Sequence, residues 1–289
     1  MFPLNKEPVF DYIKAFIQEV YYHTSSKYNS EPGILENKRD VPLIVSLTTI
    51  PERIHKVYLC TETLLRQSIK PDYIILWVSE AIQQDNVPCI LMRQKNRGLQ
   101  IRFCRDIGPY TKIIYTLKEH PESIIVTIDD DFYLPRDWLK MLFESYLKEP
   151  QYIHCYKPIQ ITMESDGQLK PKKEWVNCLP LAMEPSFHIF PEGYAGVLYP
   201  PGSLHDEVLN EEVFTRLCPL ADDIWLKAMS ILNGVCCKNV KWPNSGKYTV
   251  INGTQSKALR KINDLQNKND EQIKAVFDHY SIYNLLSDG

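Results

Sequence analysis

From Val41 onward, short apolar runs alternate with longer stretches in which apolar residues recur at helical spacing. The short runs have the length and β-branched content of strands: Leu43 to Thr48, Tyr73 to Val78, Gln100 to Cys104 and Ile124 to Ile128. The intervening stretches predict helices: Ile54 to Gln67, Val87 to Arg97, Thr111 to His120 and Trp138 to Lys148. Strands that alternate with helices form parallel sheets covered on both faces. The pattern therefore predicts an α/β fold with a mostly parallel sheet flanked by helices.

The alternation stops near residue 150, and six prolines between Pro171 and Pro201 predict an irregular half. A helix from Asp222 to Leu232 is expected there, ended by Asn233-Gly234. One or two further helices are expected in 255–286. We predict an N-terminal helical appendage (1–40), two halves (41–150 and 151–254) and a helical tail (255–289), with 41–289 forming one compact domain.

Composition narrows the class of protein. With 289 residues, 44% of them hydrophobic and 24% charged, the chain resembles an average soluble globular protein. The net charge of -3 gives no basic field that would hold nucleic acid. No stretch reaches the roughly 18 apolar residues of a membrane helix. A nucleic-acid partner is therefore not expected, and any lipid-linked substrate would be reached from the soluble side.

The chain has eight cysteines but no C-x-x-C pair, and most lie inside apolar runs, which predicts small buried hydrophobic residues. The N-terminus has no basic segment followed by an apolar one, as a secretory signal would. Both features favour a reducing compartment, so the expected location is the cytoplasm. The cysteines are Cys60, Cys89, Cys104, Cys155, Cys178, Cys218, Cys236 and Cys237.

Three adjacent acids, Asp129, Asp130 and Asp131, follow the apolar run Ile124 to Ile128. Ligands of open α/β sheets bind at the carboxyl ends of strands, where this cluster is expected. The carboxylates repel one another, and hard oxygen ligands select Mg²⁺ or Mn²⁺, which bridge to diphosphates. In an extended segment Asp129 and Asp131 point to the same side, so the pair is able to share one metal.

Another interpretation is an acidic loop that caps a helix near Pro135, because aspartate is common in such turns. The strongly apolar lead-in favours a site instead. A phosphatase with a nucleophilic aspartate would have a small Thr or Val where this chain has Tyr133.

Five segments now stand out in order along the chain: Val45-Ser46-Leu47-Thr48-Thr49-Ile50-Pro51-Glu52-Arg53, Asp106-Ile107-Gly108-Pro109-Tyr110-Thr111-Lys112, Asp129 to Asp131, Gly193 to Gly202, and Ala221-Asp222-Asp223-Ile224-Trp225. Together they resemble bacterial family 2-like glycosyltransferases of the GT-A type, from polysaccharide, capsule and lipopolysaccharide biosynthesis. The resemblance covers about residue 41 to the C-terminus. The Asp-x-Asp element alone is weakly specific, whereas the ordered set is much more so.

The resemblance implies a GT-A type, Rossmann-like fold and a hexosyltransferase that uses a nucleotide-sugar donor with Mn²⁺ or Mg²⁺. Residues 41–150 would bind the donor, and 151–254 would bind the acceptor and carry out catalysis. Asp131 matches the metal ligand, Asp129 the ribose or the metal's water shell, and Asp130 the donor sugar. Further matches at the nucleoside, base and diphosphate are Thr48, Thr49, Pro51, Arg53, Asp106 and Lys112.

One departure concerns the donor base. The second strand ends in Ser79-Glu80, without the aspartate that many family 2 enzymes use to read uracil. A UDP-sugar is the first expectation, and the base stays open. For Lys112, a solvated position on a helix face is an equal alternative, because lysines are mostly exposed.

On the acceptor side, Asp222-Asp223 resembles the acidic pair of inverting GT-A enzymes, in which the second acid deprotonates the acceptor. We expect Asp223 to be the base and the reaction to invert the anomeric centre. A structural role is the alternative, because acids at a helix start stabilise its exposed N–H groups. The expected acceptor is a glycan or a lipid-linked saccharide, the latter reached by peripheral contact at the inner face of the membrane.

Several further residues have two interpretations each. The glycines of 193–202 suit either close approach to a ligand or tight turns. His188 and His205 flank this segment, and each resembles the late histidine that some GT-A enzymes use as a metal ligand, with His205 the one we expect at the metal, although a single histidine is more often structural. The remaining candidates are a pair of aromatic residues that either stack on sugar or pack, Trp175 and Tyr194, and a basic patch that suits a charged acceptor or a solvated turn, Lys170, Lys172 and Lys173.

Two other functional classes compete with the transferase. A nucleotidyltransferase would show a glycine-rich loop after the first strand, where this chain has Thr48 to Arg53. A catalytically silent sugar- or nucleotide-binding module would not need intact acids in both acidic motifs. The sequence thus favours a metal-dependent glycosyltransferase.

Overall fold

The computed structural model describes residues 6–165, 167–177, 184–241, 249–254 and 268–287. Their main sheet has a mostly parallel arrangement, which confirms the predicted fold class. β1 pairs in parallel with β2 and β4, whereas β10 runs antiparallel to β4 and β6. The order across the sheet is β11 (Cys237–Asn239), β6 (Ile153–Cys155), β10 (Val197–Tyr199), β4 (Ile124–Thr127), β1 (Leu43–Thr49), β2 (Tyr73–Ser79) and β3 (Leu99–Cys104).

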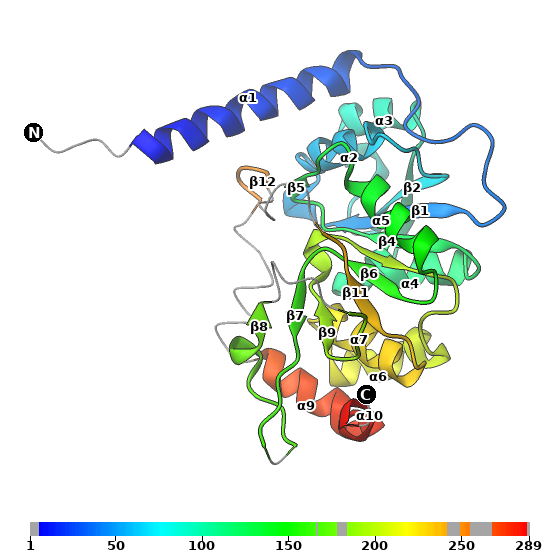
Figure 1. Cartoon of the computed structure of the whole chain (residues 1–289). Helices are drawn as coiled ribbons and strands as arrows, with labels where there is room; N and C mark the ends of the chain where they lie inside the picture. The colour runs from blue at the N-terminus through cyan, green and yellow to red at the C-terminus, as the bar shows by residue number, and fades with distance from the viewer. Residues whose placement is uncertain (1–5, 166, 178–183, 242–248, 255–267, 288–289) are drawn as a thin grey trace, which may run out of the picture.

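Helices cover both faces of this sheet (Figure 1). In the expected tail the described residues 268–287 form two helices, while 255–267 lies outside the described residues. The helices are α1 (Lys6–Tyr28), α2 (Val57–Leu65), α3 (Cys89–Lys95), α4 (Thr111–Glu119), α5 (Trp138–Lys148), α6 (Glu211–Leu217), α7 (Asp222–Leu232), α9 (Lys268–Tyr280) and α10 (Ile282–Ser287).

Two smaller sheets and several 3-10 turns complete the described structure. β5 (Phe132–Tyr133) pairs with β12 (Thr249–Val250), and β7 (Pro158–Gln160) lies between β8 (Val176–Asn177) and β9 (Ile189–Pro191). The 3-10 turns are η1 (Pro51–Arg53), η2 (Gln84–Asn86), η3 (Gly108–Tyr110), η4 (Lys172–Glu174), η5 (Gly193–Ala195) and η6 (Asp206–Leu209).

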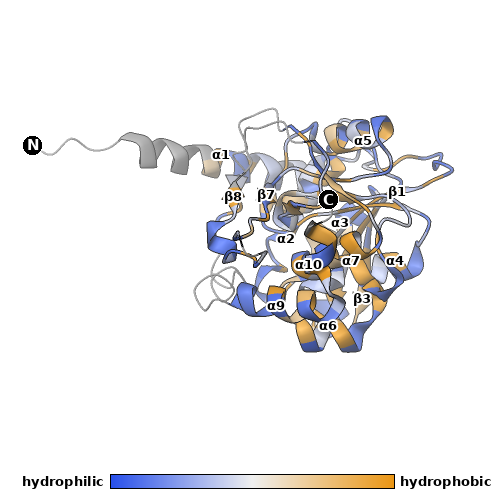
Figure 2. Cartoon of the chain, turned by 60° about the horizontal axis from the view of Figure 1, so that its bottom comes forward, coloured by the Kyte–Doolittle hydropathy of each residue, from blue (hydrophilic) through white to orange (hydrophobic). Residues whose placement is uncertain are grey.

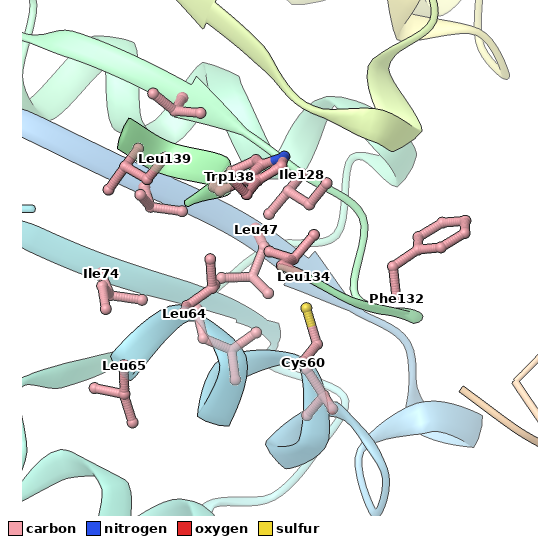
Figure 3. Packing of buried hydrophobic residues seen from close by; sticks show 14 of the residues in the cluster. Leu47, Cys60, Leu64, Leu65, Ile74, Ile128, Phe132, Leu134, Trp138 and Leu139 are labelled. Atoms are coloured by element: carbon pink, nitrogen blue, oxygen red, sulfur yellow. The ribbon is translucent and has the colours of Figure 1, made fainter. Parts of the chain in front are cut away.

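The alternation of side chains along the strands divides the core in two. On one face, Leu43, Val45 and Leu47 of β1 pack with residues of α2, α3 and α5. Figure 3 shows the part of this core between Leu47, Leu64 and Trp138. The other face packs against α4 and α7, around the fully buried Trp225. Figure 2 shows hydrophobic residues on α7 where α10 lies over it.

The second half of α1 is attached to the body through the buried carboxylate of Glu62 on α2. Ser25 Oγ donates to Glu62 Oε1 at 2.7 Å, and Arg97 pairs with Oε2 at 2.6 Å. The helix extends beyond the body (Figure 1) and leaves Phe16 and Ile17 61% exposed. Among the described residues, no helix has the length and apolar character needed to cross a bilayer.

Most of the described cysteines are buried free thiols, as expected. The expectation is wrong for Cys89, which is exposed at the start of α3, and only partly right for Cys236, which is half-buried. Cys89 follows Pro88 and is the first residue of α3, a helix that buries only Leu91 and Gln94. Cys178 lies outside the described residues.

A buried histidine makes the fold sensitive to acid. His154 of β6 is fully buried, with Nδ1 2.9 Å from Ser145 Oγ and Nε2 3.0 Å from the Glu149 carbonyl oxygen. Burial lowers its pKa to about 4. The unfolded chain therefore takes up this proton at a higher pH than the folded one, and stability falls as the pH drops from about 6.5 to about 4.

We predict that His154 removes about 2 kcal/mol from the free energy of unfolding between about pH 7 and about pH 5. Urea unfolding of wild type and His154→Gln at both pH values tests this, because the glutamine cannot be protonated. The variant should lose less stability than wild type on acidification. Equal losses in the two proteins would contradict the prediction.

Candidate active site

The acidic cluster lies at the carboxyl end of the sheet, as its sequence position predicts. β1 and β4 are parallel neighbours, with Ser46 opposite Thr127, so the residues after each strand emerge side by side. Asp129 to Asp131 follow β4, and Thr49 and Arg53 come from the end of β1 and from η1. The parallel pairing thus brings two of the five sequence segments together.

Asp130 points into the protein. Its Oδ2 accepts a hydrogen bond from Thr49 Oγ1 at 2.5 Å, and its Oδ1 pairs with an Arg53 guanidinium nitrogen at 2.6 Å. Burial raises the pKa of Asp130, although Arg53 and the Thr49 hydroxyl act in the opposite direction. This carboxylate links the β1 turn to the β4 turn, a contact that the expected role at the donor sugar did not anticipate.

Asp131 shares the same guanidinium. Its Oδ2 lies 3.2 Å from the Arg53 nitrogen, and its backbone carbonyl accepts the N–H of Ile251 at 2.8 Å. Arg53 Nε donates to the carbonyl oxygen of Thr254 at 2.9 Å. Residues 249–254, far away in the sequence, therefore lie against both Arg53 and the acidic turn.

Lys112 joins the two acidic motifs. Its Nζ lies 2.8 Å from Asp129 Oδ1 and 3.1 Å from Asp222 Oδ2, although these residues come from the turn after β4 and from the start of α7. Burial lowers its pKa, but the surrounding carboxylates outweigh this and hold the pKa well above its ordinary value. The interpretation as a solvated lysine is wrong, because Lys112 is only 5% exposed.

Local structure explains why Lys112 faces the cluster. It lies in the first turn of α4, whose preceding turn is η3. Ser46 of β1 donates to the Lys112 carbonyl oxygen at 2.5 Å and lies 2.7 Å from Thr116 Oγ1. These buried hydrogen bonds fix the start of α4 against β1, so the lysine is held at the same sheet edge as the aspartates.

The acidic pair opens α7, but its members differ in surroundings. Asp222 is 5% exposed, and burial raises its pKa to about 7 even though Lys112 lowers it. Asp223 is half-buried, and its Oδ2 accepts the backbone N–H of Gly193 at 3.0 Å. Burial raises the pKa of Asp223 as well, against the effect of Lys112. Asp223 is thus the more accessible member of the pair.

Gly193 shows which interpretation of its segment holds locally. A Cβ there would lie 2.3 Å from Asp223 Oδ1, so a side chain would displace this carboxylate. Gly196, with a φ of 113°, packs against the ring of Trp138. The glycines therefore allow close approach of the backbone to protein side chains at two points, one of them the candidate base.

The side-chain oxygens of the acidic cluster supply only part of the ligand shell of a divalent cation. In the described segments, no three His, Cys, Asp or Glu side chains converge as a metal centre. Asp129 and Asp131 each share an oxygen with Lys112 or Arg53. Mg²⁺ and Mn²⁺ often use one or two carboxylates and complete their shell with substrate phosphates and water. The residues therefore fit a cation that binds together with a diphosphate.

Other predicted residues make contacts outside this cluster. Thr48 donates to the carbonyl oxygen of Trp77 at 3.1 Å, and Pro51 is exposed in η1. Asp106 is exposed after β3 and accepts the Gly108 N–H at 2.8 Å. His205 Nδ1 accepts a hydrogen bond from the backbone N–H of Glu207. The backbone N–H of His205 donates to the carbonyl oxygen of Met229, which lies two turns along α7 from Asp222.

The remaining candidates have mainly structural contacts. His188 Nε2 lies 3.1 Å from the Leu286 carbonyl oxygen. Trp175 is buried edge-on against Phe190, which agrees with its packing interpretation. In the basic patch, Lys172 lies over the ring of Phe190 and 3.8 Å from Glu192. Tyr194 is half-buried, and the centroid of its ring lies 5.6 Å from that of Phe132, the residue that follows the acidic turn.

Three contributors were not found in the sequence. Ile251 and Thr254 act through backbone atoms, so their side chains carry no signal. Tyr199 of β10 is buried beside the acidic pair, and burial together with Asp223 and Asp222 raises its pKa well above the ordinary value. It lies inside the segment Gly193 to Gly202, but only the antiparallel pairing of β10 with β4 shows that it reaches the site.

No family model matches the chain, and no curated protein matches it in sequence. Among solved structures, it is similar to TarS 1-349 of S. aureus, with 15% identity, 72% of this chain covered and a TM-score of 0.47. The chain spans 60% of that structure's length.

A second similar structure is the mannosyltransferase PcManGT from Pyrobaculum calidifontis, in complex with GDP-Man and Mn²⁺. Here the identity is 13%, with 96% of this chain and 79% of that chain covered and a TM-score of 0.48. HddC from Yersinia pseudotuberculosis matches at 14% identity over 56% of this chain and 77% of its own, with a TM-score of 0.36. These three are likenesses of fold at low sequence identity, one of them to a mannosyltransferase.

Proposed function

We propose that the chain is a glycosyltransferase that transfers a sugar from a nucleotide-sugar donor to a glycan or lipid-linked acceptor, with a divalent cation bound together with the donor. The observation that carries the proposal is the bridge from Asp129 through Lys112 to Asp222. It unites an acidic turn suited to a metal and diphosphate with an acidic pair suited to proton transfer. The motifs that resemble GT-A enzymes lie on both sides of this bridge.

The charge balance supports a cationic ligand. Five carboxylates, Asp129 to Asp131 with Asp222 and Asp223, face two cationic side chains, Arg53 and Lys112. A diphosphate brings more negative charge to this edge, so it needs a compensating cation. Asp131 and Asp129 would hold the Mg²⁺ or Mn²⁺. When bound, the cation would neutralise charge on the leaving diphosphate.

Asp223 has the features required of the base. It is more accessible than Asp222, and the Gly193 N–H fixes one of its oxygens. As the acceptor oxygen bonds to the anomeric carbon, the bond from that carbon to the diphosphate oxygen breaks, and the acceptor proton passes to Asp223. A carboxylate accepts such a proton as attack develops. A single displacement of this kind inverts the anomeric centre.

Lys112 then has a positioning role. With its ammonium group between Asp129 and Asp222, it holds the β4 turn and the start of α7 at a fixed separation. It also lowers the pKa of both members of the acidic pair against the effect of burial. This favours the charged, proton-accepting form of Asp223.

A calorimetric titration with UDP and GDP, each with and without Mn²⁺, tests the proposal. We expect one nucleotide to bind only with Mn²⁺, and Asp131→Ala to abolish this binding. The matched control is Asp137→Ala, since Asp137 is an exposed carboxylate at the start of α5 without a side-chain capping bond. Absence of binding by either nucleotide under any condition would refute the proposal. Binding without turnover of a sugar nucleotide would favour the silent binding module.

A further inference from the structure

Arg53 lies where an approaching metal ion would meet the protein. One guanidinium nitrogen contacts Asp130 at 2.6 Å and Asp131 at 3.2 Å, and Nε donates to the Thr254 carbonyl oxygen. The side chain is 13% exposed. An arginine side chain is always charged in proteins. The guanidinium is therefore a fixed positive charge on the acidic turn.

This charge competes with a metal. Asp131 Oδ2 is within 3.2 Å of the guanidinium nitrogen, and a divalent ion on the same carboxylate would meet a full positive charge a few ångströms away. Lys112 has the same relation to Asp129. Each carboxylate suited to the metal thus already has a cationic partner, and the metal alone has little to gain by replacing it.

A diphosphate changes this balance. The planar guanidinium group matches phosphate oxygens as well as it matches carboxylates, so it has an alternative partner once a nucleotide is present. Asp130 would keep the hydrogen bond from Thr49 at 2.5 Å if the guanidinium moved. The hydrogen bond from Arg53 Nε to the Thr254 carbonyl oxygen holds the base of the guanidinium group. It therefore limits how far the guanidinium is able to move.

We propose that Arg53 is a displaceable counter-ion, which pairs with Asp131 in the free protein and moves to the donor diphosphate when metal and nucleotide bind together. Metal binding is then conditional on the nucleotide. The inference rests on the proposed function, because it takes Asp131 as a metal ligand. It adds an ordered exchange of cations that excludes the bare metal from the site.

Mn²⁺ binding, followed by the electron paramagnetic resonance signal of the free ion, tests the exchange. Wild type should bind Mn²⁺ alone at least about 10-fold more weakly than in the presence of the nucleotide that titration identifies. Arg53→Met removes the charge and should tighten binding of Mn²⁺ alone by at least about 10-fold. Arg53→Lys keeps the charge and should keep the nucleotide requirement. Arg136→Met, which removes an exposed arginine whose backbone contacts Ser68 rather than the acidic turn, is the control and should behave as wild type.

The outcomes separate this inference from the proposed function. If Arg53→Met is folded and binds Mn²⁺ no more tightly than wild type, while wild type binds nucleotide with Mn²⁺, the counter-ion role is wrong and the proposed function stands. If Arg53→Met does not fold, the test is made on the wild type alone. Equal affinity of the wild type for Mn²⁺ with and without nucleotide would overturn the proposed exchange. Failure of every variant to bind Mn²⁺, with UDP or GDP present, refutes the proposed function itself.

Discussion

Replacing Asp223 with asparagine should slow sugar transfer by about 10²- to 10⁴-fold and leave metal-dependent nucleotide binding intact. In the wild type the Gly193 nitrogen lies 3.0 Å from Asp223 Oδ2. The amide oxygen of the asparagine is still able to accept this hydrogen bond, so the backbone at Gly193 should keep its position. What the variant loses is the capacity to take up the acceptor proton. The expected signature is a fall in kcat without a matching change in nucleotide affinity.

The measurement is release of nucleoside diphosphate from the sugar nucleotide whose base the titration identifies. Asp206→Asn, which changes an exposed carboxylate on η6, serves as control and should retain the wild-type rate. Asp222→Asn shows whether the buried neighbour carries the role instead. A wild-type rate in Asp223→Asn would exclude it as the base, whatever the metal titration shows.

The second large effect is expected from Lys112→Met, which removes the cation between Asp129 and Asp222 and leaves a buried carboxylate uncompensated. Breaking one side of a buried ion pair costs about 3–5 kcal/mol, so we expect a loss of this size in the free energy of unfolding. Without Lys112, burial raises the pKa of Asp222 further, because the lysine now lowers it. Urea unfolding near neutral pH measures the loss.

Two comparisons make the result specific. Lys118→Met changes an exposed lysine on the same helix and should cost well under 1 kcal/mol. Adding Asp222→Asn to Lys112→Met removes the stranded charge and should restore part of the stability. If Lys112→Met is as stable as Lys118→Met, the bridge does not hold the two motifs together, and the main support of the proposed function falls with it.

Local pattern was sufficient for much of the scaffold. The runs beginning at Leu43, Tyr73 and Ile124 became β1, β2 and β4, and the predicted helix from Asp222 to Leu232 has the bounds of α7. These elements are long or strongly apolar, so their periodicity is visible without neighbours. The acidic turn at the end of a buried strand was visible for the same reason.

The proline-rich half was harder to predict. β6, β10 and β11 each have three residues, too few to show a period, yet they extend the main sheet. Their conformation depends on pairing with strands far away in the sequence, such as that of Val197 with Thr127. Such pairing has no local signal, because the hydrogen bonds that define it lie between backbone groups.

The sequence by itself determined the α/β order of elements, the strand ends at which the acidic residues lie, and the residue types available for chemistry. Only the tertiary structure decided which groups meet: the ammonium of Lys112 with Asp129 and Asp222, the guanidinium of Arg53 with Asp130 and Asp131, and the backbone N–H of Gly193 with Asp223. The reason is physical, since periodicity reports burial along one element, whereas ion pairing depends on how parallel strands and their helices align at the sheet edge.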